Sequence, residues 1–271
     1  MENTIFYILI FAIGSLFGSF FTLAVYRIPL HQDITHKRSY CPKCNHKLSF
    51  FDMIPIVSYL FLKGRCRYCK EKIRIRYLFL EIFTGIVFLL FGISLNLNFE
   101  NIEISKFIYL LVGLLYFAGL IIISGIDKEK RNINKNVILY ETILLSTYTI
   151  YLYIVEKANI FKYVIYLFLI CILLIYENKF FKNKLKDNYT INILILSIII
   201  TMFSGEFIFI ITVAITLLAI AFSKILSKLL KSKTVKTNNN YYKNLPIGFY
   251  LCCCNIVTII IVSMMACRWM I

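Results

Sequence analysis

Long runs of apolar residues, separated by short polar connections, dominate this chain. Eight runs have the length and composition of membrane-spanning helices. They cover residues 4–26, 77–97, 107–126, 137–155, 160–176, 187–203, 207–223 and 247–267. Hydrophobic residues make up 60% of the sequence and the mean hydropathy is +0.77, well above the range of soluble globular proteins. The pattern predicts an all-α polytopic membrane protein with about eight transmembrane helices.

The sixth and seventh runs are separated only by Ser204-Gly205-Glu206. We interpret these residues as a tight turn outside the membrane. The alternative is one long helix, which would place the following basic loop on the opposite side.

Positive charge is concentrated in every second connection between the runs. Of the 30 Lys and Arg residues, the loops 27–76, 127–136, 177–186 and 224–246 hold 12, 4, 4 and 6. Cytoplasmic loops of membrane proteins carry this excess of basic residues. The four loops are therefore expected in the cytoplasm and both termini outside. The same bias explains the net charge of +16, so no nucleic-acid partner is expected.

Two close cysteine pairs, Cys41-Pro-Lys-Cys44 and Cys66-Arg-Tyr-Cys69, lie in the first basic loop. A CxxC pair can direct two thiolates at one metal, and two pairs complete a four-cysteine zinc site. The reducing cytoplasm favours a metal over disulfides. Four thiolates leave no open position on zinc, so the expected role of the metal is structural. Reduced structural thiols or a redox role are the alternatives.

Two of the four aspartates, Asp127 and Asp187, lie where apolar runs meet cytoplasmic loops. If they are neighbours in the bundle, they can share a proton and activate a water, which is the chemistry of aspartic proteases. The alternative is that each caps a helix or lies solvated at the interface. Glu81 and Glu141 lie within apolar runs, where a carboxylate is either functional or paired structurally.

Several motifs resemble those of the type IV prepilin peptidases, also called leader peptidase/N-methyltransferases. The N-terminal block consists of Gly18-Ser19-Phe20, Tyr26-Arg27-Ile28-Pro29, both cysteine pairs, Ile54-Pro55-Ile56-Val57-Ser58-Tyr59-Leu60, Ile73-Arg74-Ile75-Arg76-Tyr77 and Glu81. Later, residues 126–133 resemble the family's first catalytic-aspartate motif, with Asn134 in place of its proline. Leu245-Pro246-Ile247-Gly248 resembles the family's Pro-Phe-Gly-Pro element.

The second catalytic-aspartate motif of that family, Gly-x-Gly-Asp-x-Lys, has no clear counterpart. Asp187 is the one aspartate in the corresponding place, but Lys186 precedes it and Tyr189 stands where the motif has lysine. Either Asp187 acts within an altered motif, or the peptidase activity is weakened or absent.

The resemblance implies a first transmembrane helix (1–26), a cytoplasmic zinc-binding loop domain (27–76) and a transmembrane aspartic peptidase core of seven helices (77–271). It further implies an endopeptidase of the bacterial inner membrane. Such an enzyme cleaves the leader of prepilin or pseudopilin precursors at the cytoplasmic face through Asp127 and Asp187. Methylation of the new N-terminus with S-adenosylmethionine is implied by the resemblance alone.

Two other functions remain open at this point. A catalytically impaired relative could bind pilin precursors or assembly factors, as the altered second motif suggests. A transporter or channel with a zinc-binding loop ranks lower, because the interiors of the apolar runs hold few charged residues.

Overall fold

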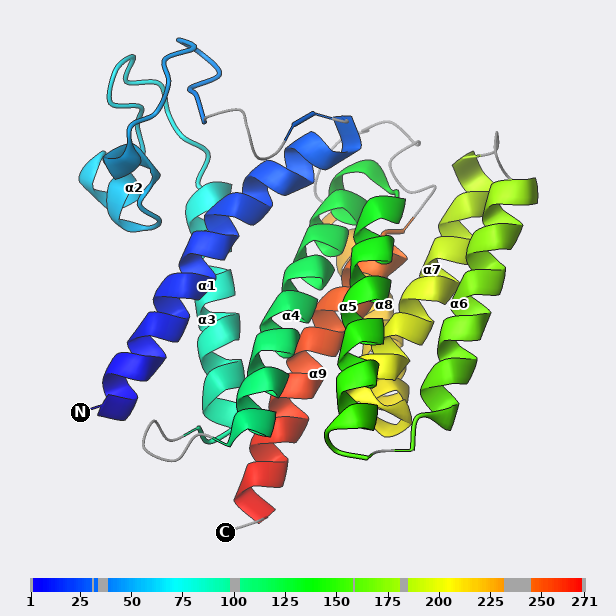
Figure 1. Ribbon diagram of the computed structural model, residues 1–271. Helices are drawn as coiled ribbons and strands as arrows, with labels where there is room; N and C mark the ends of the chain where they lie inside the picture. Colours follow the sequence, from blue (N-terminus) through cyan, green and yellow to red (C-terminus); the bar gives the residue numbers. More distant parts are fainter. Residues whose placement is uncertain are drawn as a thin grey trace. The chain divides into compact units, whose positions relative to one another are not determined.

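The computed structural model describes residues 2–30, 32–33, 39–97, 103–157, 159–180, 185–231 and 245–269, and this part of the chain is helical (Figure 1). The long helices are α1 (Glu2–Arg27), α3 (Arg76–Ser94), α4 (Ile104–Lys130), α5 (Lys135–Ile154), α6 (Phe161–Phe180), α7 (Leu185–Ser204), α8 (Glu206–Lys231) and α9 (Ile247–Trp269). Each corresponds to one apolar run of the sequence. Three short helices, η1 (Ile28–Leu30), η2 (Phe50–Met53) and α2 (Val57–Phe61), lie between α1 and α3.

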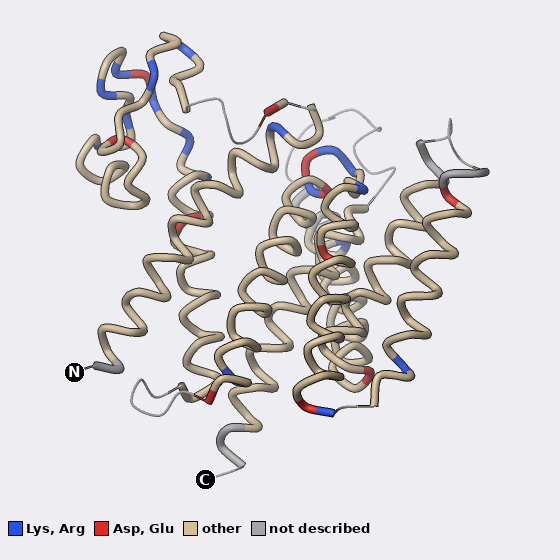
Figure 2. Tube along the Cα trace, viewed as in Figure 1, with Lys and Arg blue, Asp and Glu red and all other residues tan. Residues whose placement is uncertain are grey.

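Within the described residues, six helices are long and apolar enough to cross a membrane: α1, α3, α4, α5, α8 and α9. Helix α7 adds a shorter apolar stretch, Asn188–Ser204. The predicted all-helical class is confirmed, and six of the about eight predicted spans have membrane-crossing length and composition within the described residues. In the part of the chain that contains α1 and α3, Lys and Arg gather in the loop between these two helices, while the helices themselves carry few charges (Figure 2).

The boundary between α7 and α8 confirms the predicted turn and excludes one long helix. Helix α7 ends at Ser204 and α8 begins at Glu206. Gly205 between them has φ +81°, a left-handed conformation that glycine adopts without steric cost. The N–H of Gly205 still donates to the Thr201 carbonyl oxygen at 2.9 Å, which closes the end of α7.

The chain divides into two compact units, Met1–Leu114 with Ser263–Ile271, and Leu115–Val262. In the first unit α1 packs closely against α3 because glycines line the contact. A β-carbon at Gly14 would lie 2.8 Å from the Thr84 carbonyl oxygen and 2.9 Å from Gly85 Cα. Gly18, four residues later, also faces α3 at Thr84. Small residues spaced in this way let membrane helices approach closely.

In the second unit a chain of polar side chains joins three helices inside the apolar bundle. The Tyr116 hydroxyl on α4 donates to Asn255 Oδ1 on α9 at 2.8 Å. Asn255 Nδ2 donates in turn to Thr212 Oγ1 on α8 at 3.3 Å. Asn255 and Thr212 are fully buried. Buried polar groups in a membrane protein need such partners, so this chain fixes the register of α4, α8 and α9.

Glu141 on α5 is fully buried against α4 in the same unit. Its carboxylate occupies the space that a β-carbon at Gly119 would need. Neither carboxylate oxygen has a hydrogen-bond partner among the described residues. Because Gly119 has no side chain, α4 leaves room for the Glu141 carboxylate between α4 and α5.

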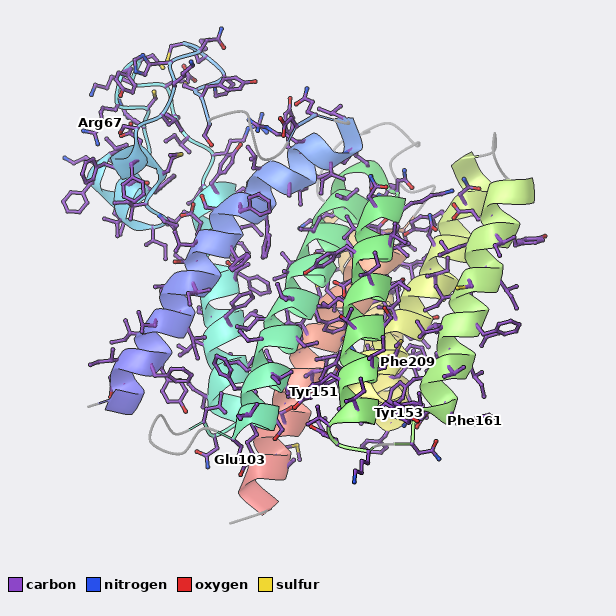
Figure 3. The ribbon with its side chains drawn as sticks, in the orientation of Figure 1. Arg67, Glu103, Tyr151, Tyr153, Phe161 and Phe209 are labelled. Carbon is purple, nitrogen blue, oxygen red and sulfur yellow. The ribbon has the colours of Figure 1, made fainter. Side chains whose placement is uncertain are left out.

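Aromatic side chains gather at the end of the second unit where α5 ends and α6 begins. Tyr151 and Tyr153 on α5, Phe161 on α6 and Phe209 on α8 lie at this end (Figure 3). Tyr153 and Phe161 are exposed. Aromatic residues in such a belt are typical of the boundary between a bilayer and water.

The contact between α1 and α3 predicts the effect of Gly14→Ala. The new methyl group would meet backbone atoms of α3, which cannot move aside as a side chain can. We expect a loss of about 1–3 kcal/mol of stability. Thermal unfolding of the purified protein in detergent measures this loss. Leu16→Ala, at an exposed position of the same helix, is the control and should change the midpoint much less. Equal midpoints for wild type and Gly14→Ala would contradict this packing.

Candidate functional site

The two cysteine pairs adopt the same local backbone fold. In each pair, the residue before the first cysteine forms an antiparallel bridge with the residue three positions after the second. The N–H of each first cysteine donates to the carbonyl oxygen five residues later. The bridges are Tyr40–Lys47 and Arg65–Lys72, and the bonds are Cys41 to His46 (3.0 Å) and Cys66 to Glu71 (2.8 Å). This repeated geometry is that of two facing knuckles, each presenting two thiols.

The four sulfur atoms of Cys41, Cys44, Cys66 and Cys69 lie within 4.8 Å of one another. Cys41 Sγ and Cys69 Sγ are 3.7 Å apart. Four sulfurs bound tetrahedrally at about 2.3 Å from zinc are spaced about 3.8 Å apart. A hydrogen bond from the backbone N–H of Cys44 is the largest influence on Cys41, and the pKa of this thiol falls to about 7. The residues present therefore fit a structural zinc ion, as the spacing predicts.

An ion pair between a half-exposed arginine and a buried aspartate joins the second knuckle to η2. Arg67 Nε donates to Asp52 Oδ1 at 2.6 Å, and the Asp52 side chain is only 2% exposed. Asp52 Oδ2 accepts from the Ser49 hydroxyl at 2.8 Å. Burial acts to raise the pKa of Asp52, but the bonds from Arg67 and Ser49 outweigh it and hold the pKa below its usual value. Arg67 lies on the rim of the loop (Figure 3).

In the second unit, Asp127 is fully buried near the end of α4. Its Oδ2 accepts two hydrogen bonds, from the Tyr189 hydroxyl on α7 at 3.1 Å and from the Phe249 N–H on α9 at 2.9 Å. Its Oδ1 has no partner among the described residues. The described residues thus fix the carboxylate through one oxygen and give the other no hydrogen bond.

Phe249 is the third residue of α9, so Asp127 binds the N-terminus of that helix. A helix N-terminus attracts an anion through its free N–H groups and its dipole. Gly248 brings the two helices together: a β-carbon there would lie 3.0 Å from Asp127 Oδ2 and 3.2 Å from Ile133 Cδ1. The segment Leu245-Pro246-Ile247-Gly248, singled out by its sequence, therefore lies against Asp127.

Tyr189 is a site residue that the sequence did not identify as such. Its hydroxyl donates to Asp127 and accepts from the Ile247 N–H at 3.0 Å, so it links α4, α7 and the start of α9. The available signal was its position two residues after Asp187, where the resembled motif has lysine. No sequence pattern shows that a tyrosine 62 positions away contacts Asp127.

Asp187 belongs to α7, but its side chain lies outside the described residues. Its pairing with Asp127 therefore stays a prediction. Glu177, a buried acid on α6, has its Oε1 3.1 Å from Lys135 Nζ. The Glu177 side chain is buried, and its ion pair with Lys135 balances its charge.

Glu81, the candidate acid of the first unit, binds the loop. Its Oε2 accepts from the Ile56 N–H at 2.7 Å.

Asn134, which replaces the motif's proline, caps α5, because its Oδ1 accepts from the Asn136 N–H at 2.9 Å. The substitution therefore keeps the start of this helix.

Comparison with known proteins gives a partial match. The family model of the bacterial peptidase A24 N-terminal domain matches residues 12–95. Curated relatives named prepilin leader peptidase/N-methyltransferase come from Myxococcus xanthus, Vibrio cholerae and Bacillus subtilis. They are 35%, 41% and 38% identical to this chain over 112, 98 and 104 residues.

Residues 12–95 form a bacterial peptidase A24 N-terminal domain. The resemblance to the prepilin peptidase family is thereby confirmed for this part of the chain, which contains the four cysteines and Glu81. The aligned segments cover 41%, 32% and 38% of this chain and 33%, 39% and 42% of those three relatives. Asp127 and Asp187 lie outside the matched domain. No solved structure matches the chain.

The four-cysteine cluster of the A24 domain predicts one zinc per chain. Cys66→Ser removes a buried ligand, and we expect the zinc content to fall below half of that of the wild type, because three thiolates hold the ion less tightly. Elemental analysis of the purified protein measures it. The control Cys171→Ser changes an exposed cysteine of α6 and should keep the metal. Unchanged zinc in Cys66→Ser would contradict the site.

The close approach of α9 to Asp127 predicts that Gly248→Ala destabilises the protein by about 1–3 kcal/mol, since the carboxylate has to move. Chemical unfolding in detergent measures the change. In an Asp127→Ala background the same substitution should cost clearly less, because the clash is gone. The same cost in both backgrounds would show that Gly248 acts independently of Asp127.

Proposed function

We propose that this protein is a membrane aspartic endopeptidase that removes the leader of type IV prepilin-like precursors at the cytoplasmic face of the membrane. The observation that carries the proposal is the buried Asp127 carboxylate, held through Oδ2, while Oδ1 has no partner among the described residues. Relatives named prepilin leader peptidase/N-methyltransferase support the same reaction.

In the proposed reaction Asp127 and Asp187 share one proton. The ionised carboxylate takes a proton from a water, and the water oxygen attacks the scissile carbonyl carbon. The protonated acid donates to the carbonyl oxygen. A proton then moves to the amide nitrogen, the carbon–nitrogen bond breaks, and the leader leaves with a new carboxylate. The remaining precursor keeps a free N-terminal amine.

The proposed topology has eight spans, with both termini outside and the zinc loop in the cytoplasm. It rests on the 26 Lys and Arg residues that fall in alternate loops. The membrane is proposed to be the bacterial inner membrane, as expected for relatives of this family. The reaction would then take place near the basic loop 127–136, where Asp127 lies close to the end of the candidate span Ile104–Lys130.

Methylation of the new amine with S-adenosylmethionine is the less supported part of the proposal. The name of the relatives includes this activity.

A second candidate is a relative that binds precursors or assembly factors without cutting them. The specific observation in its favour is Tyr189, which stands in place of the motif lysine and occupies Asp127 Oδ2. In a binding protein that does not cut its partner, the role of Asp127 would be to fix the N-terminus of α9.

Precursor cleavage in proteoliposomes separates the two candidates. Asp127→Asn and Asp187→Asn should each lower the cleavage rate at least about 100-fold, because each removes a proton-transferring group. Asp33→Asn, at an exposed position of the zinc loop, is the matched control and should cleave normally. No cleavage by wild type, with retained binding of the precursor, would favour the binding protein. Equal cleavage by wild type, Asp127→Asn and Asp187→Asn would exclude the aspartic mechanism.

A further inference from the structure

An exposed apolar surface covers η2 and α2 in the loop between α1 and α3. Phe50 and Phe51 are 72% and 70% exposed, and Leu60 and Phe61 are 63% and 84% exposed. Val57 is exposed beside them. Helix α2 packs against η2, so these side chains belong to one patch, residues 50–61, which we call the apolar wedge. Exposed patches of this kind mark an interaction surface.

A hydrogen bond fixes the depth of the wedge relative to α3. Ile56, the residue before α2, donates its N–H to Glu81 Oε2 at 2.7 Å. Glu81 is the sixth residue of α3, about 7.5 Å along the axis from its first residue. Because α3 is a candidate membrane span, α2 begins level with the second turn of that span. An apolar surface at this level lies at the boundary between lipid headgroups and acyl chains.

The wedge is held rigidly to the zinc-binding knuckles. The Tyr59 hydroxyl donates to the Ile73 carbonyl oxygen at 3.4 Å, and the Ile73 N–H donates to the Gly64 carbonyl oxygen at 2.8 Å. The pair of Arg67 and Asp52 ties the second knuckle to η2. The wedge and the second knuckle therefore move together.

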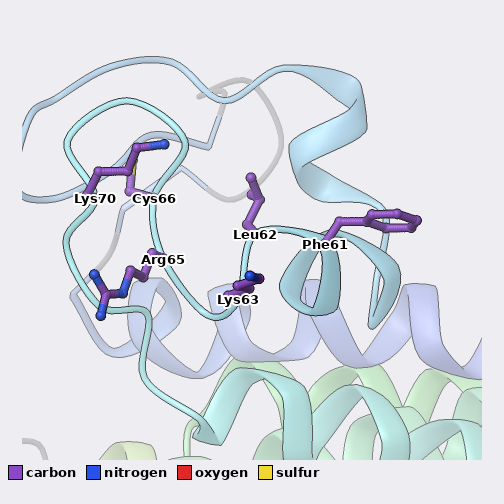
Figure 4. Close-up of a pocket in the computed structure, with 6 residues that line it drawn as sticks. All are labelled: Phe61, Leu62, Lys63, Arg65, Cys66 and Lys70. Carbon is purple, nitrogen blue, oxygen red and sulfur yellow. The ribbon is translucent and has the colours of Figure 1, made fainter.

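A basic pocket adjoins the wedge. Lys63, Arg65 and Lys70 line a depression of about 430 Å³, together with Phe61, Leu62 and Cys66. Phe61 points away from Arg65 and Lys70, and Leu62 and Lys63 lie between them (Figure 4). A surface with an apolar side and an adjacent basic side suits a phospholipid with an anionic headgroup.

We propose that the apolar wedge inserts into the cytoplasmic leaflet and that the basic pocket beside it binds the anionic headgroup of a phospholipid. The lipid bilayer would thus help to hold the zinc-binding loop at a fixed height above the spans. Charge favours a lipid over a precursor leader as the occupant, because a basic leader would be repelled by Lys63, Arg65 and Lys70. The proposal is independent of the peptidase activity.

Tryptophan fluorescence of the full chain in liposomes tests the wedge. Trp269→Phe removes the single native tryptophan, and Phe61→Trp then reports from the wedge. We expect its emission to be quenched by phospholipids brominated on their acyl chains. Aqueous acrylamide should quench it several-fold less than it quenches Tyr40→Trp, the matched control on the first knuckle. Phe50→Trp repeats the measurement at a second position, and zinc content verifies the fold of each variant.

A change in the lipid composition of the liposomes tests whether the basic pocket binds an anionic headgroup. Vesicles of phosphatidylcholine alone are compared with an equal mixture of phosphatidylcholine and phosphatidylglycerol. We expect stronger protection of the Phe61→Trp reporter in the anionic mixture, and loss of this difference in Lys63→Gln/Lys70→Gln. Protection that is the same in both vesicles and in both proteins would overturn the headgroup site.

One result would overturn the wedge itself. If acrylamide quenches the Phe61→Trp and Phe50→Trp reporters as strongly as the Tyr40→Trp reporter in both vesicles, the patch faces water. Protection that then arises only after a precursor is added would assign the patch to a protein partner.

Discussion

The hydrogen bonds that hold Asp127 at the N-terminus of α9 are the constraint on which the proposed chemistry depends. A carboxylate buried in an apolar bundle is costly unless donors surround it. Tyr189 and the Phe249 N–H supply those donors from two helices distant in sequence. They satisfy one oxygen and fix the direction of the other. The close packing at Gly248 follows from the same arrangement, since a larger residue would displace the carboxylate.

In the proposed function the two units carry different parts. The zinc-binding knuckles and the apolar wedge belong to the first unit and are built from short-range contacts around Cys41–Cys44 and Cys66–Cys69. The acid site belongs to the second unit and is built from α4, α7 and α9. A four-thiolate zinc ion would have no open position, so a metal bound there would shape the loop. The proposed reaction is therefore assigned to the carboxylates.

Local patterns predicted most of the fold and the metal site. The apolar runs located the eight long helices of the described residues, six of which are long and apolar enough to cross a membrane, and Gly205 between two runs marked the turn. Paired cysteine spacing located the metal site because a knuckle is closed by bonds within a few residues. The Tyr189 contact, the Glu81–Ile56 bond and the space for Glu141 beside Gly119 could not be predicted in this way. Each depends on helix packing that brings distant residues together, and helix periodicity does not encode it.

The separation of the Asp127 and Asp187 carboxylates, measured by cryo-electron microscopy of the protein in a lipid nanodisc, tests the central claim most directly. The aspartic peptidase mechanism predicts that one water lies between them, within about 2.6–3.2 Å of an oxygen of each. Carboxylates more than about 10 Å apart, with no helix motion able to close the gap, could not share a proton or a water. That result would contradict the peptidase and leave Asp127 as the group that fixes α9.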